Sequence, residues 1–169
     1  MVSSTVNSWA VFRFALGYPD ARHLERFTEL CEHVPATLDE LRSLYIDLFE
    51  AGLPQPRCPL LESAWLLNRP AGEVVLENKL YYQTFGLEID GRAAPDHLLT
   101  QLEFLAWLDH CEAAGNTDRE SLRRARRDFL ERHLSHWVGS LAHLAGNSGA
   151  GCYAELLEAL AREVERSLG

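Results

Sequence analysis

The 169-residue chain lacks the patterns that identify membrane-inserted, exported and zinc-binding proteins. No uncharged apolar run approaches the ~18 residues that a membrane-spanning helix needs. The first residues, Met1 to Trp9, contain no basic segment followed by an apolar one, as a signal peptide would. The four cysteines lie far apart and include no CxxC pair, so their spacing predicts no zinc site. We therefore expect a soluble, cytoplasmic protein with reduced thiols and no membrane insertion.

Basic residues are scarce. The chain has 16 lysines and arginines against 25 acids, a net charge of −9, and residues 20–112 hold 17 of the acids but only 7 bases. Nucleic-acid binding needs clustered lysines and arginines. The composition therefore argues against a nucleic-acid partner and favours a cationic one.

Motifs of the common enzyme classes are also missing. The sequence contains no GxSxG, HExxH, P-loop or GxGxxG pattern. His133 and His136 have the spacing of two ligands on one helical face, although an isolated pair of this kind is more often structural. We predict no catalytic residue, metal or cofactor. Two alternatives stay open: a helical metal-dependent hydrolase that uses Asp96, His97 and these two histidines, and a generic helical adaptor.

Helical periodicity is what the sequence does contain. Apolar residues recur at the 3.6-residue period along most segments, and no alternating strand pattern is present. The sequence predicts an all-α, single-domain bundle over residues 1–169, with about seven to nine helices joined by Pro-rich loops. Two helices are predicted to begin at the capping boxes Thr37-Leu-Asp-Glu40 and Thr117-Asp-Arg-Glu120, the second bending near 133–135. The other predicted helices cover 8–16, 20–33, 60–67, 71–85, 95–114 and 152–168.

A stiff loop precedes the first candidate binding segment. Three prolines between residues 52 and 59 exclude helix and favour extended geometry. Glu62, Ser63 and Trp65 follow at once. A preorganised loop with a carboxylate and an indole suits peptide binding, because little conformational entropy is lost when the peptide binds. The alternative is that Trp65 lies in the core and Glu62 in solvent.

The helix predicted over 95–114 begins with an unusual set of ionisable residues. Asp96 and Glu103 fall on one stripe of this helix, and His97 lies at its rim. Each residue also has an ordinary explanation: Asp96 as the N-cap, His97 bonded to a carbonyl group, and Glu103 in solvent. The leucines on the opposite side are predicted to face the core: Leu98, Leu102 and Leu105.

Four segments, in this order along residues 45–137, resemble the TorD, DmsD and NarJ family of molybdoenzyme-specific chaperones, the redox enzyme maturation proteins. They are Tyr45-x-x-Leu48-Phe49 with Pro59-x-x-Glu62-Ser63-x-Trp65; Tyr82-x-x-Phe85-Gly86-Leu87; Pro95-Asp96-His97-Leu98 with Leu102-Glu103-Phe104; and Phe129-x-x-x-His133-Leu134-x-x-Trp137. The short loop at 86–95 is more similar to the branch that serves respiratory or hydrocarbon-type dehydrogenases than to the trimethylamine-oxide branch.

The resemblance implies a cytoplasmic chaperone without catalytic turnover. Such proteins bind the catalytic subunit of a DMSO-reductase-family molybdoenzyme until its cofactor is inserted. Many also bind the twin-arginine signal peptide of that subunit and so delay export. On this chain, the resemblance implies a client and signal-peptide groove bordered by Tyr45, Phe49, Glu62, Ser63, Trp65, Asp96, His97 and Glu103.

The residue chemistry agrees with that implication. A twin-arginine peptide carries its arginines first and an apolar segment after them. Carboxylates could therefore pair with its guanidinium groups, while Trp65 and Phe49 contact the apolar segment. We expect a monomer; the glycine-rich break at 146–151 leaves a domain-swapped dimer as the alternative.

Overall fold

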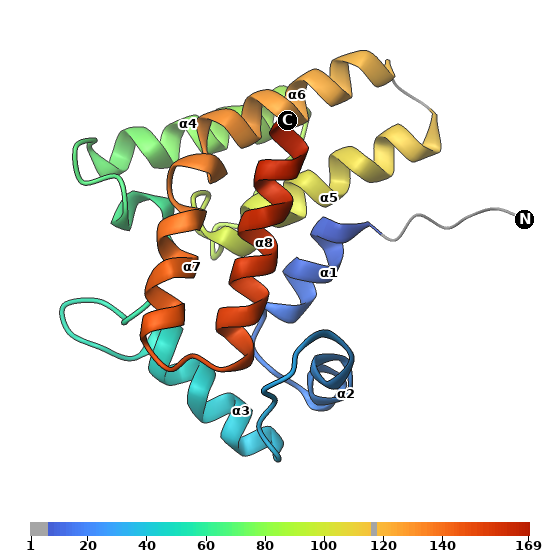
Figure 1. The fold of residues 1–169 in the computed structure, drawn as a ribbon. Coiled ribbons are helices and arrows are strands. Elements are labelled where there is room, and N and C mark those ends of the chain that lie inside the picture. Colours follow the sequence, from blue (N-terminus) through green and yellow to red (C-terminus); the bar gives the residue numbers. More distant parts are fainter. Residues whose placement is uncertain (1–6, 116–117) are drawn as a thin grey trace, which may run out of the picture.

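The computed structural model describes residues 7–115 and 118–169 (Figure 1). Within these ranges the chain forms eight α-helices and no strand, which confirms the all-α prediction. They are α1 (Ser8–Ala15), α2 (Ala21–Leu30), α3 (Leu38–Tyr45), α4 (Ala71–Thr84), α5 (Leu98–Ala114), α6 (Arg119–Arg132), α7 (Val138–Asn147) and α8 (Cys152–Leu168). A π-helical turn, Ile46–Glu50, continues α3, and two 3-10 turns cover Glu62–Ala64 and Leu134–His136.

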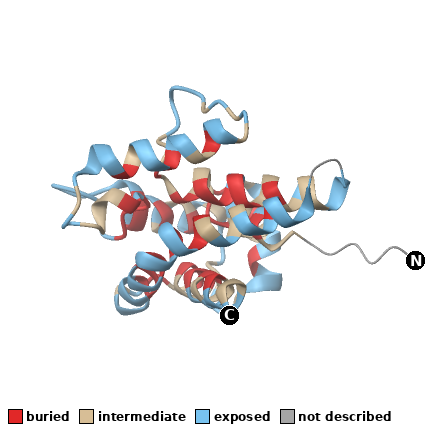
Figure 2. Ribbon diagram, turned by 90° about the horizontal axis from the view of Figure 1, so that it is seen from above, coloured by how far each residue is buried: buried red, intermediate tan, exposed pale blue. Residues whose placement is uncertain are grey.

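One cluster of buried side chains runs from Trp9 in α1 to Val164 in α8. α7 packs along α8, α1 packs on α5, and α5 packs on α6, while α4 lies beside α6 at the edge of the molecule (Figure 1). Buried positions line the inner sides of the helices and exposed positions the outer sides (Figure 2). None of the helices in the described ranges is long and apolar enough to span a membrane.

Helix starts follow the predicted capping chemistry. The Thr37 hydroxyl accepts from the Glu40 N–H at 3.2 Å, and the Glu40 carboxylate accepts from the Thr37 N–H at 3.1 Å. Asp20 caps α2, which lies within the helix predicted over 20–33. Thr117, predicted to open the next capping box, lies outside the described residues; α6 is capped by Asp118, whose carboxylate accepts from a first-turn N–H. Satisfying these backbone donors fixes where each helix begins.

The helix expected over 60–67 is wrong, because this segment makes only one 3-10 turn. The Leu60 carbonyl accepts from the Leu98 N–H at 2.8 Å, and Leu61 forms an isolated antiparallel bridge with His97. Backbone groups used in this long-range pairing are not available for helical hydrogen bonds.

The same pairing moves the start of α5. The helix predicted over 95–114 begins at Leu98, three residues later, because His97 is held in extended geometry with φ −75° and ψ 137°. It ends at Gly115, a left-handed residue with φ 71°. The bend expected near 133–135 is confirmed: α6 ends at Arg132 and a 3-10 turn leads into α7. Leu98, Leu102 and Leu105 are fully buried, as predicted.

Candidate functional site

Glu62 is the centre of a buried hydrogen-bond network. Its side chain has no exposed surface, so the alternative that placed it in solvent is wrong. Asn78 Nδ2 donates to Glu62 Oε2 at 2.8 Å, and Gln101 Nε2 donates to the same oxygen at 2.7 Å. His133 Nδ1 lies 3.0 Å from both carboxylate oxygens. One carboxylate therefore joins a 3-10 turn, α4, α5 and the end of α6.

This network explains how a carboxylate can be buried at all. An acidic group without partners in an apolar interior loses several kcal/mol of solvation, and hydrogen-bond donors are needed to replace the lost water. Asn78 Oδ1 also accepts from Gln101 Nε2 at 2.9 Å, so the two amides are oriented by each other as well as by Glu62.

Asp96 supports the turn that carries Glu62. Its side chain is 2% exposed, and its Oδ2 accepts from the Ser63 N–H at 3.1 Å. Its main-chain carbonyl accepts from the Glu62 N–H at 3.0 Å. Asp96 is therefore not the N-cap of α5, which corrects that interpretation. Its two hydrogen bonds hold the Glu62–Ala64 turn against the N-terminus of α5.

His97 is the residue that caps α5. Its Nδ1 accepts from the Leu99 N–H at 3.1 Å. Burial lowers the pKa of the imidazole, against the opposing effect of the neighbouring Asp96 carboxylate. The unprotonated ring is the form whose Nδ1 can accept a hydrogen bond.

Trp65 is half-buried beside the same turn. Its indole Nε1 donates to the Pro59 carbonyl at 2.9 Å, and its ring centroid lies 6.5 Å from that of the buried Trp137. The structure thus brings together five of the eight predicted site residues: Glu62, Ser63, Trp65, Asp96 and His97.

The other three predicted residues lie elsewhere. Tyr45 and Phe49 are buried at 5% and 6% exposure, and both rings pack edge-on against Tyr153. Glu103 is exposed on α5, where it pairs with Arg13 at 3.0 Å.

Sequence reasoning missed Asn78 and Gln101. A usable signal exists for Asn78, because it lies on the stripe of α4 that also holds Val74 and Tyr82, the buried residues of that helix. His133, whose spacing from His136 suits a metal ligand, faces Glu62 instead. In the described ranges, no group of three or more His, Cys, Asp or Glu side chains is arranged to hold a metal ion.

A second feature is a cavity of about 310 Å³ between α5 and the loop at 86–95, which we call the acidic pocket. Its acids are Glu88, Asp90 and Glu103, and its lining includes no lysine or arginine. Its apolar wall is formed by Tyr82, Leu87, Ile89, Phe104 and Trp107. Negative charge around an apolar floor suits a ligand that combines a cationic group with an apolar one.

Residues 17–143 match the family model described as nitrate reductase delta subunit. The selenate reductase assembly chaperone protein of Thauera selenatis is 40% identical over 130 residues, 72% of this chain and 66% of the relative. The chlorate reductase assembly chaperone protein of Ideonella dechloratans is 38% identical, with the same two shares covered.

A third relative, the dimethyl sulfide dehydrogenase assembly chaperone protein of Rhodovulum sulfidophilum, is 36% identical over 66% of this chain and 49% of its own length. The matched part thus spans less than two thirds of each of these relatives. A solved structure from Archaeoglobus fulgidus, described as a candidate redox enzyme maturation protein, aligns with a TM-score of 0.64 at 18% identity, covering 94% of this chain and 93% of that one. At that identity the match shows a shared fold.

Proposed function

The chain belongs to the nitrate reductase delta subunit family, and on that premise we propose that it is a cytoplasmic assembly chaperone for a molybdenum oxidoreductase. It binds the catalytic subunit of a DMSO-reductase-family enzyme during cofactor insertion, without catalytic turnover of its own. The observation that carries the proposal is the family match over residues 17–143. The names of the relatives, assembly chaperone proteins of selenate reductase, chlorate reductase and dimethyl sulfide dehydrogenase, support it.

The predicted site residues divide into two roles under this proposal. Ser63, Trp65, His97 and Glu103 keep some exposed surface and can touch a client directly. The buried residues act indirectly: Glu62 and Asp96 hold the turn in place, and Tyr45 and Phe49 form part of the core, where they pack on Tyr153. A guanidinium group cannot reach Glu62 while Asn78 and Gln101 occupy it.

The acidic pocket is the best place for the arginines of a twin-arginine signal peptide. Glu88, Asp90 and Glu103 can accept charge-assisted hydrogen bonds from guanidinium groups, and Phe104 and Trp107 can contact the apolar residues that follow. Among the described residues, Glu103 uses only its Oε2 on Arg13, at 3.0 Å, and its side chain is exposed, so its Oε1 is free to accept from a guanidinium group of a peptide.

Molybdenum content tests the chaperone role. A catalytic subunit of the DMSO-reductase family is expressed with and without this chain, and the molybdenum bound per subunit is measured. We expect cofactor-poor subunit when the chain is absent. Equal molybdenum content in the two preparations would contradict the proposal.

Calorimetry tests signal-peptide recognition separately. The full chain is titrated with the signal peptide of that subunit, and then with the same peptide carrying two lysines in place of the arginines. We expect Glu88→Gln combined with Glu103→Gln to weaken binding about tenfold or more, since charge-assisted hydrogen bonds contribute roughly 1.5–3 kcal/mol each. Glu25→Gln combined with Glu120→Gln removes two exposed acids outside the pocket and is the control. Affinity weaker than ~100 μM for the unmodified peptide would exclude recognition of this segment but not of the mature subunit.

A further inference from the structure

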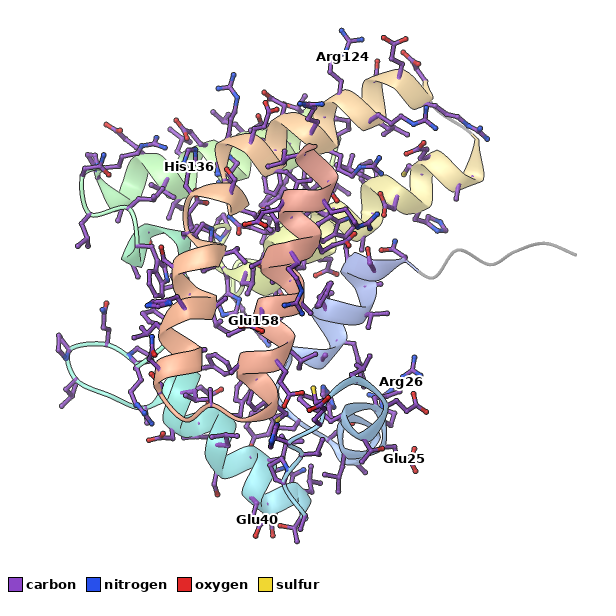
Figure 3. All side chains as sticks on the ribbon, viewed as in Figure 1. Glu25, Arg26, Glu40, Arg124, His136 and Glu158 are labelled. Atoms are coloured by element: carbon purple, nitrogen blue, oxygen red, sulfur yellow. The ribbon has the colours of Figure 1, made fainter. Side chains whose placement is uncertain are left out.

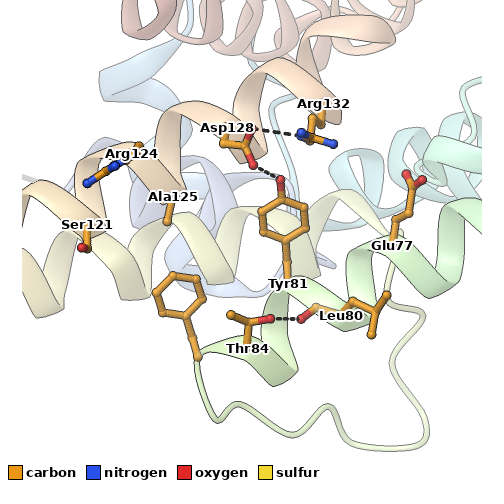
Figure 4. Close-up of a pocket in the computed structure, with 10 residues that line it drawn as sticks. Glu77, Leu80, Tyr81, Thr84, Ser121, Arg124, Ala125, Asp128 and Arg132 are labelled. Carbon is orange, nitrogen blue, oxygen red and sulfur yellow. Dashed lines mark hydrogen bonds and ion pairs between the residues drawn. The ribbon is translucent and has the colours of Figure 1, made fainter.

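A groove of about 430 Å³ lies between α4 and α6 (Figure 4). Its floor is apolar and is made by Leu80, Tyr81, Phe85 and Ala125. Leu80 is 51% exposed and so adds open apolar surface to this floor.

The acids of this groove are engaged within the chain. Glu77 pairs with Arg69 at 2.8 Å. Asp128 accepts from the Tyr81 hydroxyl and from Arg132 Nε (Figure 4). The Tyr81 hydrogen bond, with that of Arg132, holds the pKa of Asp128 below its usual value. Both oxygens of Asp128 are thus occupied, and the charge of Glu77 is balanced by Arg69.

The arginines of the groove keep open donors. Arg124 points outward from α6 (Figure 3), its nearest carboxylate is Glu120 at 3.9 Å, and it donates no hydrogen bond to any described residue. Arg132 uses its Nε on Asp128, and its two terminal nitrogens donate to nothing in the described ranges. The groove thus presents guanidinium donors beside exposed apolar surface.

The helix α6, which forms one wall of the groove, is rich in arginine. α6 contains six arginines against three acids, a balance of +3. Because the whole chain carries −9, the rest of it carries −12. The lining of the groove holds two acids and two arginines, so its preference for carboxylates comes from the open guanidinium donors of Arg124 and Arg132 beside apolar surface.

We propose that the groove between α4 and α6 binds a client segment whose apolar side chains are flanked by carboxylates. Leu80 and Phe85 contact the apolar side chains, and Arg124 and Arg132 pair with the carboxylates. The identity of this partner as the catalytic subunit rests on the proposed function; the chemistry of the groove does not. The chain then has two binding sites that prefer ligands of opposite charge: the acidic pocket binds a cationic segment, and this groove binds an acidic one.

Two synthetic helical peptides of about 15 residues test the proposal. Both carry the same stripe of leucine and phenylalanine; one has glutamates beside the stripe and the other lysines. Fluorescence anisotropy measures binding of each to the full chain at low and high salt. We expect the glutamate peptide to bind about tenfold more tightly at low salt, with the difference reduced at high salt.

Matched variants locate the binding. We expect Arg124→Glu and Leu80→Ser each to weaken the glutamate peptide about fivefold or more. Arg127→Glu removes an arginine of α6 that pairs with Glu131 outside the groove, and Leu76→Ser changes a leucine of α4 that is 54% exposed outside it. These two controls should change affinity less than about twofold.

Several results would overturn the proposal. They are absence of binding by the glutamate peptide, equal binding of the two peptides, and equal effects of the groove and control variants. Self-association in sedimentation experiments that both Arg124→Glu and Leu80→Ser abolish would instead assign the groove to a second copy of this chain. Failure of the calorimetric test on the acidic pocket has no bearing on these outcomes, because the two sites are probed with different variants and oppositely charged peptides.

Discussion

Among single residues, Glu62 is the one on which the buried hydrogen-bond network depends. A carboxylate that follows a proline-rich loop and precedes an indole has the sequence context of a peptide-binding acid. In the structure it accepts from two side-chain amides and faces an imidazole, all of them buried. Its carboxylate oxygens are therefore used by residues of this protein and not by a client peptide.

Replacement of Glu62 by Gln should destabilise the fold. Gln has nearly the same shape, but when its carbonyl oxygen takes the Oε2 position, to which Asn78 and Gln101 both donate, its NH₂ group lies at the Oε1 position and faces His133 Nδ1, which then has no acceptor there. We expect a loss of about 2–4 kcal/mol in the free energy of unfolding, measured by urea denaturation. Glu25→Gln, on the exposed side of α2, should change it by less than about 0.5 kcal/mol. Equal effects of the two substitutions would show that the network adds little stability.

His97 should make stability depend on pH. Burial lowers its pKa in the folded protein below the ordinary value of 6.5, so the unfolded chain binds a proton more readily than the folded one. The stability that His97 contributes is therefore fully present above pH 6.5 and is lost as the pH falls from there through the folded-state pKa. His97→Asn supplies a cap that does not titrate. Urea unfolding of both proteins across this range should give a difference that moves in favour of the variant at lower pH; a constant difference would contradict the assignment.

Among the structural elements, the loop at 51–59 depends for its conformation on one glycine. Gly52 has a φ of +140°, and a Cβ added there would lie 2.5 Å from the Gln55 carbonyl oxygen. That oxygen belongs to the backbone, so the loop itself would have to move. The rigidity expected from its three prolines therefore also requires a residue without a side chain.

Gly52→Ala should lower the free energy of unfolding by about 1–3 kcal/mol, because the new side chain meets both strained backbone and a close contact. Gly91→Ala is the matched control, since no atom lies within 4 Å of an added Cβ there and its φ is not positive. We expect this control to lie within about 0.5 kcal/mol of the parent in thermal or urea unfolding. A Gly52 variant as stable as the Gly91 variant would mean that the loop adjusts freely.

Elements defined by local rules are those that the sequence predicts well. The capping box at Thr37 and the 3.6-residue periodicity depend on residues a few positions apart, and both are confirmed. The failure at 60–67 has a physical cause: Leu60 and Leu61 pair with residues more than thirty positions away, at the start of α5. Tertiary pairing of this kind overrides local helical preference.

The candidate site was predictable only in part, for the same reason. The Glu62 partners Asn78, Gln101 and His133 lie 16, 39 and 71 positions away. No periodicity or motif spacing links residues at such separations. The family resemblance identified most of the segments that meet, and the family itself is confirmed, but it did not distinguish the side chains that face a client from those that hold the turn.

The whole molecule is organised around one cluster of buried residues between α1 and α8. We therefore expect one cooperative unfolding transition, as predicted for a single domain. Circular dichroism reports all eight helices, and the tryptophans, two of them buried at Trp9 and Trp137, report distant parts of the cluster. Urea midpoints from the two signals should coincide. Separate midpoints would indicate two independently folding parts.

α4 is held to the rest of the molecule in an unusual way. Its buried residues are Val74, Asn78 and Tyr82, and two of these three attach through polar groups: Asn78 to Glu62, and the Tyr82 hydroxyl to the Pro95 carbonyl at 2.8 Å. α4 also supplies walls to both the groove and the acidic pocket. Local opening of this helix would disrupt both cavities at once, whereas a ligand in either one favours the closed form. Amide hydrogen exchange across residues 71–84 thus becomes a single readout of occupancy at either face, with slower exchange whenever a client is bound.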